Sequence, residues 1–279
     1  MRKLFDPVVG WYPPESRRSN LGLNNFFTYG WTEGWSEPEE GPDDAPRFRL
    51  LRIQRAFWER ELRLTYNSAF RPDAHGNDEQ EGEFELELPI SRRFLIEFEG
   101  GVAAARQAGR HWMAQASDLR ITPEVMLIET HRLSFSSGLV VETPTGGRAV
   151  EQGRTSLTPY LALWGDLGHR IGLHSYLGSE FPLGGSGSSS PTAVLQYAIA
   201  PSITVTPKSM DYLGDLTFFI EGDGETRAGN RISRTTLNLL PGTRWLVFRD
   251  TWIAAGYEFP ITEPKPFTGR AWVSLYLDF

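Results

Sequence analysis

The last nine residues of the chain alternate strictly between apolar and other side chains. They read AWVSLYLDF, and every second position is apolar: Ala271, Val273, Leu275, Leu277 and Phe279. Side chains of a β-strand point alternately to opposite faces. The pattern therefore predicts a terminal strand with one apolar face.

The same period of two recurs along most of the chain and predicts about twelve strands. Most are long enough to cross a bilayer at a tilt, and about twice as long as a usual soluble strand. The expected ranges are 57–70, 82–90, 92–105, 118–128, 131–143, 154–164, 169–181, 192–206, 211–222, 231–246, 250–261 and 267–279. Residues Arg47 to Gln54 are one further candidate, so we allow about ten to fourteen strands.

The connections between these strands alternate between short and long. Short ones are expected at 89–93, 129–131, 164–169, 206–211 and 247–250. Long polar ones are expected at 71–82, 107–117, 144–153, 184–191, 222–230 and 263–268. Tight turns at the periplasmic end and longer loops at the external end are typical of transmembrane barrels. An even number of strands places both chain ends on the periplasmic side.

The apolar faces of the expected strands carry almost no charge. A charge that faces lipid near the bilayer centre costs about 2 to 4 kcal/mol, so this scarcity favours lipid contact. The alternative is a soluble barrel in which the same faces form the core. We predict an all-β fold, a transmembrane antiparallel up-and-down β-barrel of residues 47–279. The outward set includes Leu64, Tyr66, Phe84, Phe98, Leu161, Ile203, Phe218, Ile220 and Tyr257.

Composition narrows the classes of function. The 279 residues carry a net charge of −7 without any Lys/Arg-rich block, so we expect no nucleic-acid partner. The chain has no cysteine, which excludes disulfides and thiolate metal sites. Its five histidines are scattered without ligand spacing, so we expect no metal and no other cofactor. No apolar run reaches about 18 residues, the length of a transmembrane helix.

Residues 1–46 are rich in Pro, Gly and acidic residues and show no sustained period, which predicts a loop-like leader. An aromatic cluster within it makes the leader a candidate plug or lid at the periplasmic mouth; the alternative is a simple cover over the first strands. The opening MRKLFDPVVGWYPP has no apolar stretch of signal-peptide length, so an exported protein needs a signal not visible here. The cluster comprises Phe26, Phe27, Tyr29, Trp31 and Trp35.

The opposite faces of the strands are polar and are expected to line a lumen. Four glutamates fall on two neighbouring strands with an arginine beside them, an arrangement that could orient a polar solute or favour cations. The equally open alternative is that charged pairs interlock and close the barrel. The expected lining residues are Arg63, Glu85, Glu87, Glu97, Glu99, Arg120, His174, Tyr176, Arg234, Arg244, Trp252, Trp272 and Tyr276.

An enzyme is the least favoured alternative. An outer-membrane phospholipase needs a serine activated by a nearby histidine. The adjacent pairs are His131 with Ser134 and His174 with Ser175, and in both the two side chains fall on opposite faces of a strand. We therefore predict no catalytic residues.

The terminal strand ending on Phe279 resembles the closing strand of bacterial outer-membrane β-barrels. That resemblance implies an outer-membrane location, contact with lipid, and recognition by the barrel-assembly machinery through Val273, Leu275, Leu277 and Phe279. The segments FWERELRLTY, LLPGTRW and YEFPITEPKPF further resemble the MetA-type phenol-degradation-pathway porins. This second resemblance implies hydrophobic or aromatic solutes and transfers no functional residue.

Two functions remain open at this stage. The first is a passive outer-membrane channel or solute-binding barrel. The second is a closed structural or interaction barrel whose loops or leader bind a partner. The sequence predicts neither the oligomeric state nor the identity of a solute.

Overall fold

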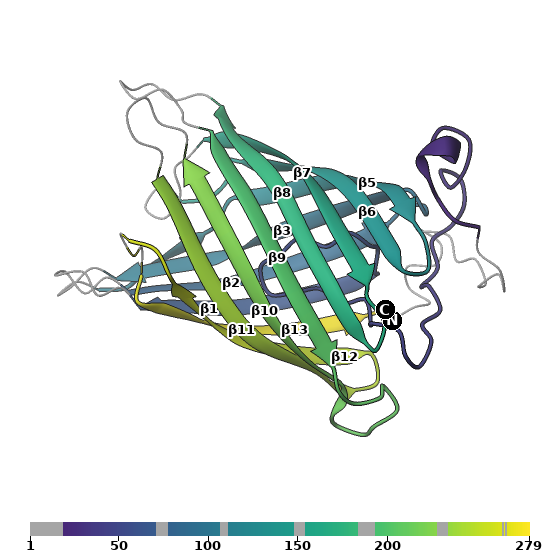
Figure 1. Cartoon of the computed structure of the whole chain (residues 1–279). Coiled ribbons are helices and arrows are strands. Elements are labelled where there is room, and N and C mark those ends of the chain that lie inside the picture. The colour runs from purple at the N-terminus through teal and green to yellow at the C-terminus, as the bar shows by residue number, and fades with distance from the viewer. Residues whose placement is uncertain are drawn as a thin grey trace.

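The protein folds into one closed β-barrel (Figure 1). The computed structural model describes residues 19–70, 78–106, 111–147, 154–183, 193–227, 234–263, 265 and 267–279. Within these residues one continuous antiparallel sheet holds 13 strands. The only helix described is a three-residue 3-10 turn, Leu23–Asn25. No helix in the described ranges is long and apolar enough to cross a membrane.

The strands follow one another around the ring in chain order. Their bounds are β1 (Glu61–Phe70), β2 (Asp78–Pro89), β3 (Phe94–Arg106), β4 (Met113–Ala116), β5 (Leu119–Glu129), β6 (Leu133–Thr143), β7 (Thr155–Asp166), β8 (Ile171–Leu183), β9 (Val194–Thr204), β10 (Gly214–Arg227), β11 (Arg234–Phe248), β12 (Thr251–Pro260) and β13 (Gly269–Asp278).

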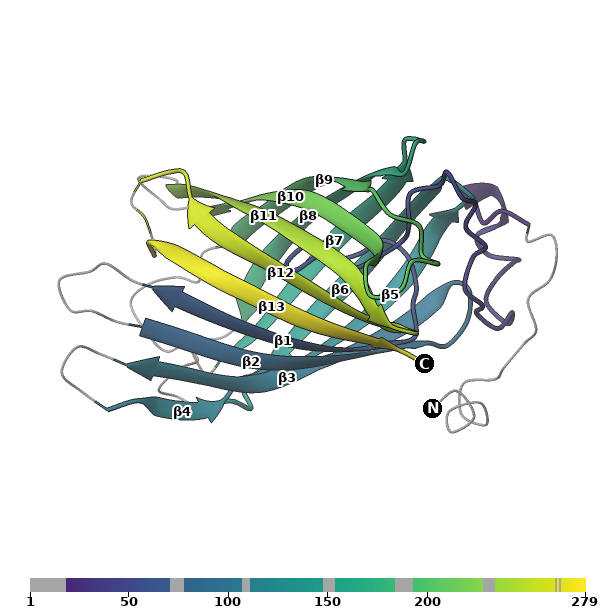
Figure 2. The same ribbon diagram turned by 90° about the horizontal axis from the view of Figure 1, so that it is seen from below.

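The ring closes between the last strand and the first. β13 pairs with β1 over its whole length, from Glu61 opposite Asp278 to Phe70 opposite Gly269. Figure 2 shows these two strands side by side. β3 pairs with β5 near its start and with the short β4 near its end, so β4 and β5 together occupy one position in the ring. The barrel thus has twelve positions, which confirms the predicted fold and strand number.

Several expected elements differ from the structure. The expected connections 107–117 and 222–230 include strand residues, namely β4 and the end of β10. Arg47 to Gln54, the further strand candidate, forms no strand, and β1 begins at Glu61 rather than at 57. Arg47–Gln54 lies inside the barrel, where its arginine and its apolar side chains are both buried against the inner wall. The alternation of charged and apolar residues there therefore does not mark a strand with one face toward lipid. The expected short connection at 206–211 is longer, and spans 205–213 between β9 and β10.

The short connections gather at one end of the barrel, which we name the turn end; the opposite end is the loop end. The β11–β12 turn consists of Arg249 and Asp250 alone, and Arg249 has a positive φ of 48°. In the β7–β8 turn Gly168, with φ 81°, begins a left-handed stretch. Most of the residues expected in the long connections, including 71–77, 148–153 and 184–191, lie outside the described residues.

An apolar surface surrounds the barrel. Its side chains alternate with inward-facing polar ones, as the period of two requires. Members on different strands include Leu64, Phe84, Leu161, Leu177, Ile199, Phe218, Tyr257 and Val273, all exposed. A monomeric soluble protein rarely exposes so large an apolar surface, so this belt indicates contact with lipid.

Candidate functional site

The interior of the barrel is largely filled by residues 45–60, which we name the lumen loop. It enters from the turn end, where Ala45 N donates to Asp166 Oδ1 at 3.2 Å. It reaches its tip near Arg52 and returns to the turn end, where Arg60 O accepts a hydrogen bond from Phe279 N at 3.1 Å. Figure 1 shows this segment inside the ring of strands. The lumen loop leads directly into β1.

One carboxylate on β10 holds the tip of the lumen loop. The backbone N–H groups of Leu51, Arg52 and Ile53 all donate to Glu221, at 2.8, 3.0 and 3.1 Å. The side chain of Arg52 adds ion pairs of 2.5 Å to Asp223 and to Glu258. Hydrogen bonds to a charged acceptor are among the stronger ones in proteins. The tip is therefore fixed to β10 and β12.

On the opposite side the lumen loop pairs with glutamates of β2 and β3. Arg49 lies 2.6 Å from Glu87 and 2.8 Å from Glu97, and it also contacts Glu85. Arg63 of β1 lies 2.5 Å from Glu85 and donates to the carbonyl of Leu51 at 3.2 Å. Arg55 contacts Glu87 and lies 2.6 Å from Glu59. Buried charges are tolerated when they are paired in this way.

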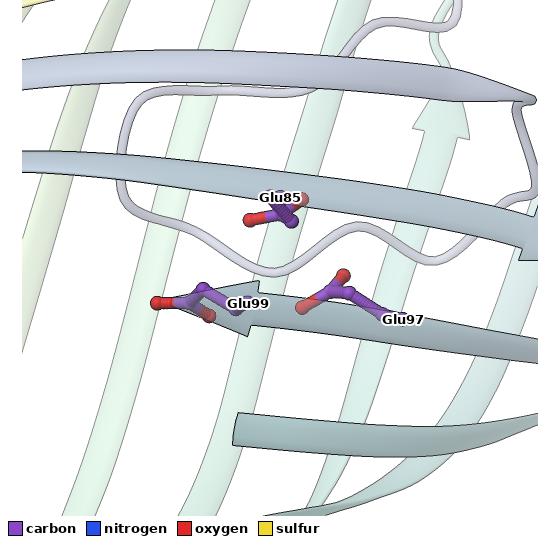
Figure 3. Close-up of side chains that lie close together, drawn as sticks. All are labelled: Glu85, Glu97 and Glu99. Atoms are coloured by element: carbon purple, nitrogen blue, oxygen red, sulfur yellow. The ribbon is translucent and has the colours of Figure 1, made fainter. Parts of the chain in front are cut away.

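Glu85, Glu97 and Glu99 come close enough together to suggest a cation site (Figure 3). Their carboxylate oxygens lie within 4.8 Å of one another. Arginine side chains already occupy the space between these carboxylates, however: Arg49 contacts Glu85 and Glu97, and Arg120 contacts Glu99. Glu85 and Glu97 therefore anchor the loop, and Glu99 pairs with the wall.

Apolar contacts complete the attachment of the lumen loop to β10–β13. Phe48 and Leu50 are buried against inward side chains of these strands. Arg244 of β11 stacks over the rings of Phe48 and Trp252, with its guanidinium carbon 5.1 and 4.7 Å from the two ring centroids. Trp272 Nε1 donates to Glu258 at 2.9 Å. Aromatic and cationic groups thus share this part of the wall.

Above the tip of the lumen loop, toward the loop end, lies an open cavity of about 340 Å³, which we name the vestibule. Arg52 and Gln54 form its floor. Five carboxylates, two arginines and several hydroxyl or amide groups line it. Arg120 bridges the carboxylates of Glu99 and Glu142, with 2.9 Å to the latter. Tyr176 OH donates to Gln196 at 3.2 Å. The vestibule is polar and carries an excess of negative charge.

Residues 19–44 pack against the turn end. Leu21 pairs with Glu129 as an isolated β-bridge, and Arg93 donates to Tyr29 O at 2.6 Å. Arg92 lies 2.6 Å from Glu129. Burial lowers the pKa of Arg92, but the nearby carboxylates of Glu129 and Glu33 raise it by more, so it stays charged. The role of residues 1–46 as a plug or lid stays a prediction. The segment that lies within the lumen begins only at Ala45, near the end of this leader, and continues to Arg60.

Twelve of the thirteen expected lining residues can be placed. All lie on inward-facing positions, and all but Arg120 and Tyr176 are buried. Arg234 is the first residue of β11, and its side chain is outside the described part of the structure. Their role in solute passage stays a prediction. The residues placed are Arg63, Glu85, Glu87, Glu97, Glu99, Arg120, His174, Tyr176, Arg244, Trp252, Trp272 and Tyr276.

Sequence reasoning missed the arginines of the lumen loop. Arg47, Arg49, Arg52 and Arg55 recur every two or three residues in a stretch without acidic residues. The expected strands 82–90 and 92–105 carry an unbalanced excess of glutamate, for which these arginines are the natural partners. This match between arginines in 47–55 and glutamates in the expected strands was the signal in the sequence that could have placed the segment inside the barrel.

The structure forms neither of the serine–histidine pairs considered for an enzyme. His174 faces inward on β8, and the neighbouring Ser175 faces outward. His131 lies in the β5–β6 turn, largely exposed, with Nε2 3.0 Å from Asp44. Ser134 is fully buried, and its Oγ has no hydrogen-bond partner among the described residues. A serine nucleophile needs a base within hydrogen-bond reach, and this histidine points elsewhere.

The comparisons with known proteins concern the fold alone. No family model matches the sequence, and no curated protein matches it. An outer membrane channel from Pseudomonas putida F1 has a similar structure, with a TM-score of 0.59 and 10% identity over 87% of this chain and 100% of that chain. The NanC porin is also similar, with a TM-score of 0.53 and 9% identity over 78% of this chain and 98% of that chain. The chain is thus a closed antiparallel twelve-stranded β-barrel with the fold of outer membrane channels and porins.

Proposed function

We propose that the protein is an outer-membrane channel for small polar solutes, with the lumen loop setting its aperture. The vestibule is the observation that carries this proposal. It is an open, polar cavity inside a closed barrel, and its floor is the tip of a loop that leaves no room for a wide pore. The shared fold with a channel and a porin supports the same function.

The outer membrane is the location that best suits the surface. The apolar belt needs lipid, and the terminal strand presents Val273 and Leu275 to the same side. We propose that Val273, Leu275, Leu277 and Phe279 are read by the barrel-assembly machinery during insertion.

The lining of the vestibule favours polar or cationic solutes. Five carboxylates face two arginines there, and a narrow lumen with such a lining attracts cations. The resemblance to phenol-degradation-pathway porins implied hydrophobic or aromatic solutes. Tyr176 is the aromatic side chain of the vestibule that would serve such solutes, and it is outnumbered by charged groups.

The attachment of the lumen loop favours a second candidate, a closed structural barrel. Arg49, Arg52 and Arg55 tie the loop to several strands at once. Current recording in planar bilayers separates the two functions. A stable open level is the result expected of a channel. Electrical silence from a protein that still shows the heat-modifiable gel migration of a folded barrel would favour the closed barrel.

A further inference from the structure

The lumen loop is held unequally on the different sides of the barrel. Ion pairs and backbone hydrogen bonds tie it to β2, β3, β10 and β12. Toward β6–β9 it presents Ala56 and Phe57, which pack against Ala162 and Trp164, and the guanidinium carbon of Arg47 lies 4.2 Å from the ring centroid of Trp164. Among the described residues, its hydrogen bonds to this side lie at the turn end, such as that of Ala45 N to Asp166.

The wall that faces this apolar side of the loop carries polar atoms without partners. They are Ser134 Oγ, Ser136 Oγ, Trp164 Nε1 and His174 Nε2, and none has a hydrogen-bond partner within the described structure. Each of these residues is at most 2% exposed. Buried polar groups are nearly always satisfied by protein or water, because leaving them unpaired is unfavourable. Four of them on adjacent strands indicate a surface that receives water or a polar solute.

Small side chains continue this surface upward to the vestibule. Along β6 the inward positions above Ser134 are Ser136 and Gly138, and the ring of Tyr160 on β7 covers Gly138, where an added Cβ would lie only 2.5 Å from that ring. Along β9 the inward positions are Ala198, at the vestibule, then Ala200 and Ser202. These small positions belong to β6 and β9, whereas β7 and β8 between them carry Tyr160, Trp164, His174 and Tyr176. The walls at β2, β3 and β10–β13 carry glutamates and large aromatic side chains at comparable depth.

We infer that the solute path runs along the β6–β9 wall, between this wall and the lumen loop, from the vestibule to the turn end. The inference rests on the proposed channel function. A shift of the loop away from this wall breaks apolar contacts and the stacking of Arg47 on Trp164, and it lets water reach the serines and the imidazole. A shift away from β2 and β3 would instead separate buried ion pairs, which is strongly unfavourable. The path therefore suits small solutes that exchange hydrogen bonds with hydroxyl groups.

Single-cysteine variants test this path, because the chain has no cysteine of its own. Ser136→Cys and Ser202→Cys place a thiol on the path from β6 and β9. Ser274→Cys on β13 is the matched control, since Ser274 is equally buried and its hydroxyl is already paired with Thr65 at 2.8 Å. Each full-length variant is checked for heat-modifiable migration and reconstituted in planar bilayers. Current is then recorded before and after addition of a small cationic methanethiosulfonate reagent.

We expect the reagent to remove most of the current through Ser136→Cys and Ser202→Cys and to leave Ser274→Cys unchanged. If Ser136→Cys does not fold, Ser202→Cys alone decides the outcome. Current that persists in the path variants, or an equal or greater loss in Ser274→Cys, overturns the path. In both of those cases the unmodified protein conducts and the channel function stands. A silent but folded unmodified protein overturns the channel function, and the path with it.

Discussion

The guanidinium of Arg49 lies 2.8 Å from the carboxylate of Glu97, with only 2% and 0% of the two side chains exposed. Arg49 belongs to the lumen loop and Glu97 to β3. The same guanidinium contacts Glu85 and Glu87. One loop residue thus contacts three wall carboxylates, and it fastens the loop to the wall away from water.

Replacing Arg49 by Met removes this charge while keeping much of the side-chain length. Breaking a buried ion pair costs about 3 to 5 kcal/mol, because the remaining charges are left uncompensated. We expect a lower free energy of unfolding and a larger, noisier single-channel current as the loop loosens. Urea unfolding in vesicles and bilayer recording measure the two effects.

Arg106→Met is the matched control for Arg49→Met. Arg106 pairs with Asp78 at 2.5 Å, but the two side chains are 44% and 29% exposed. Exposed pairs contribute about 0 to 1 kcal/mol, so little change in stability or current is expected. Equal effects of the two substitutions would contradict the anchoring role of Arg49.

The tip of the lumen loop depends on Glu221 in the same way. Glu221→Ala leaves the N–H groups of Leu51, Arg52 and Ile53 without their acceptor, and each unsatisfied buried donor costs about 1 to 3 kcal/mol. We expect much faster hydrogen exchange at these three amides. Glu180→Ala, in the vestibule wall, should leave their exchange unchanged. Protection that survives Glu221→Ala would show that the apolar contacts of the tip are sufficient.

The strands were predictable from the sequence because successive residues of a barrel strand face lipid and lumen in turn, so that apolar and polar side chains alternate. The expected strand 131–143 became Leu133–Thr143, and 169–181 became Ile171–Leu183. The alternating faces also predicted which side chains turn inward, such as Glu97. Local pattern was sufficient for these elements, since each strand has one face toward lipid and one toward the lumen.

The lumen loop was not predictable in this way, because its partners are distant in sequence. RFRLLRIQ alternates like a strand, yet Arg49 pairs with Glu97 and Leu51 N donates to Glu221, a separation of 170 residues. A charged and an apolar side chain are both buried there, each against a different wall. Periodicity shows that the two sides of this segment differ in polarity. It does not show that both sides contact the wall of the barrel.

The outward belt gives a prediction about the membrane. Leu177 lies near the middle of β8 and is 50% exposed, whereas Leu167 lies in the β7–β8 turn and is 62% exposed. A lysine at the bilayer midplane costs about 2 to 4 kcal/mol, and one near the interface about 0 to 1 kcal/mol. Leu177→Lys should therefore destabilise the barrel in vesicles more than Leu167→Lys. Equal stability of the two variants would mean that water, not lipid, surrounds the barrel.

The charge of the vestibule predicts its ion selectivity. Among the described residues, Arg52 pairs with Asp223 and Arg120 with Glu142, whereas Glu180 and Glu225 form no ion-pair contact with an arginine. These two carboxylates therefore dominate the field that an entering ion meets, and they favour cations.

Glu180→Gln combined with Glu225→Gln reduces the five carboxylates of the vestibule to three, against two arginines. The field weakens while the size and hydrogen-bonding capacity of the lining are nearly preserved. We expect the permeability ratio of cations to anions to fall, measured as a shift of the reversal potential under a KCl gradient. Asp250→Asn, in the β11–β12 turn, removes a charge outside the vestibule and should leave that potential in place. A shift toward stronger cation preference in the double variant would place the selective field elsewhere in the lumen.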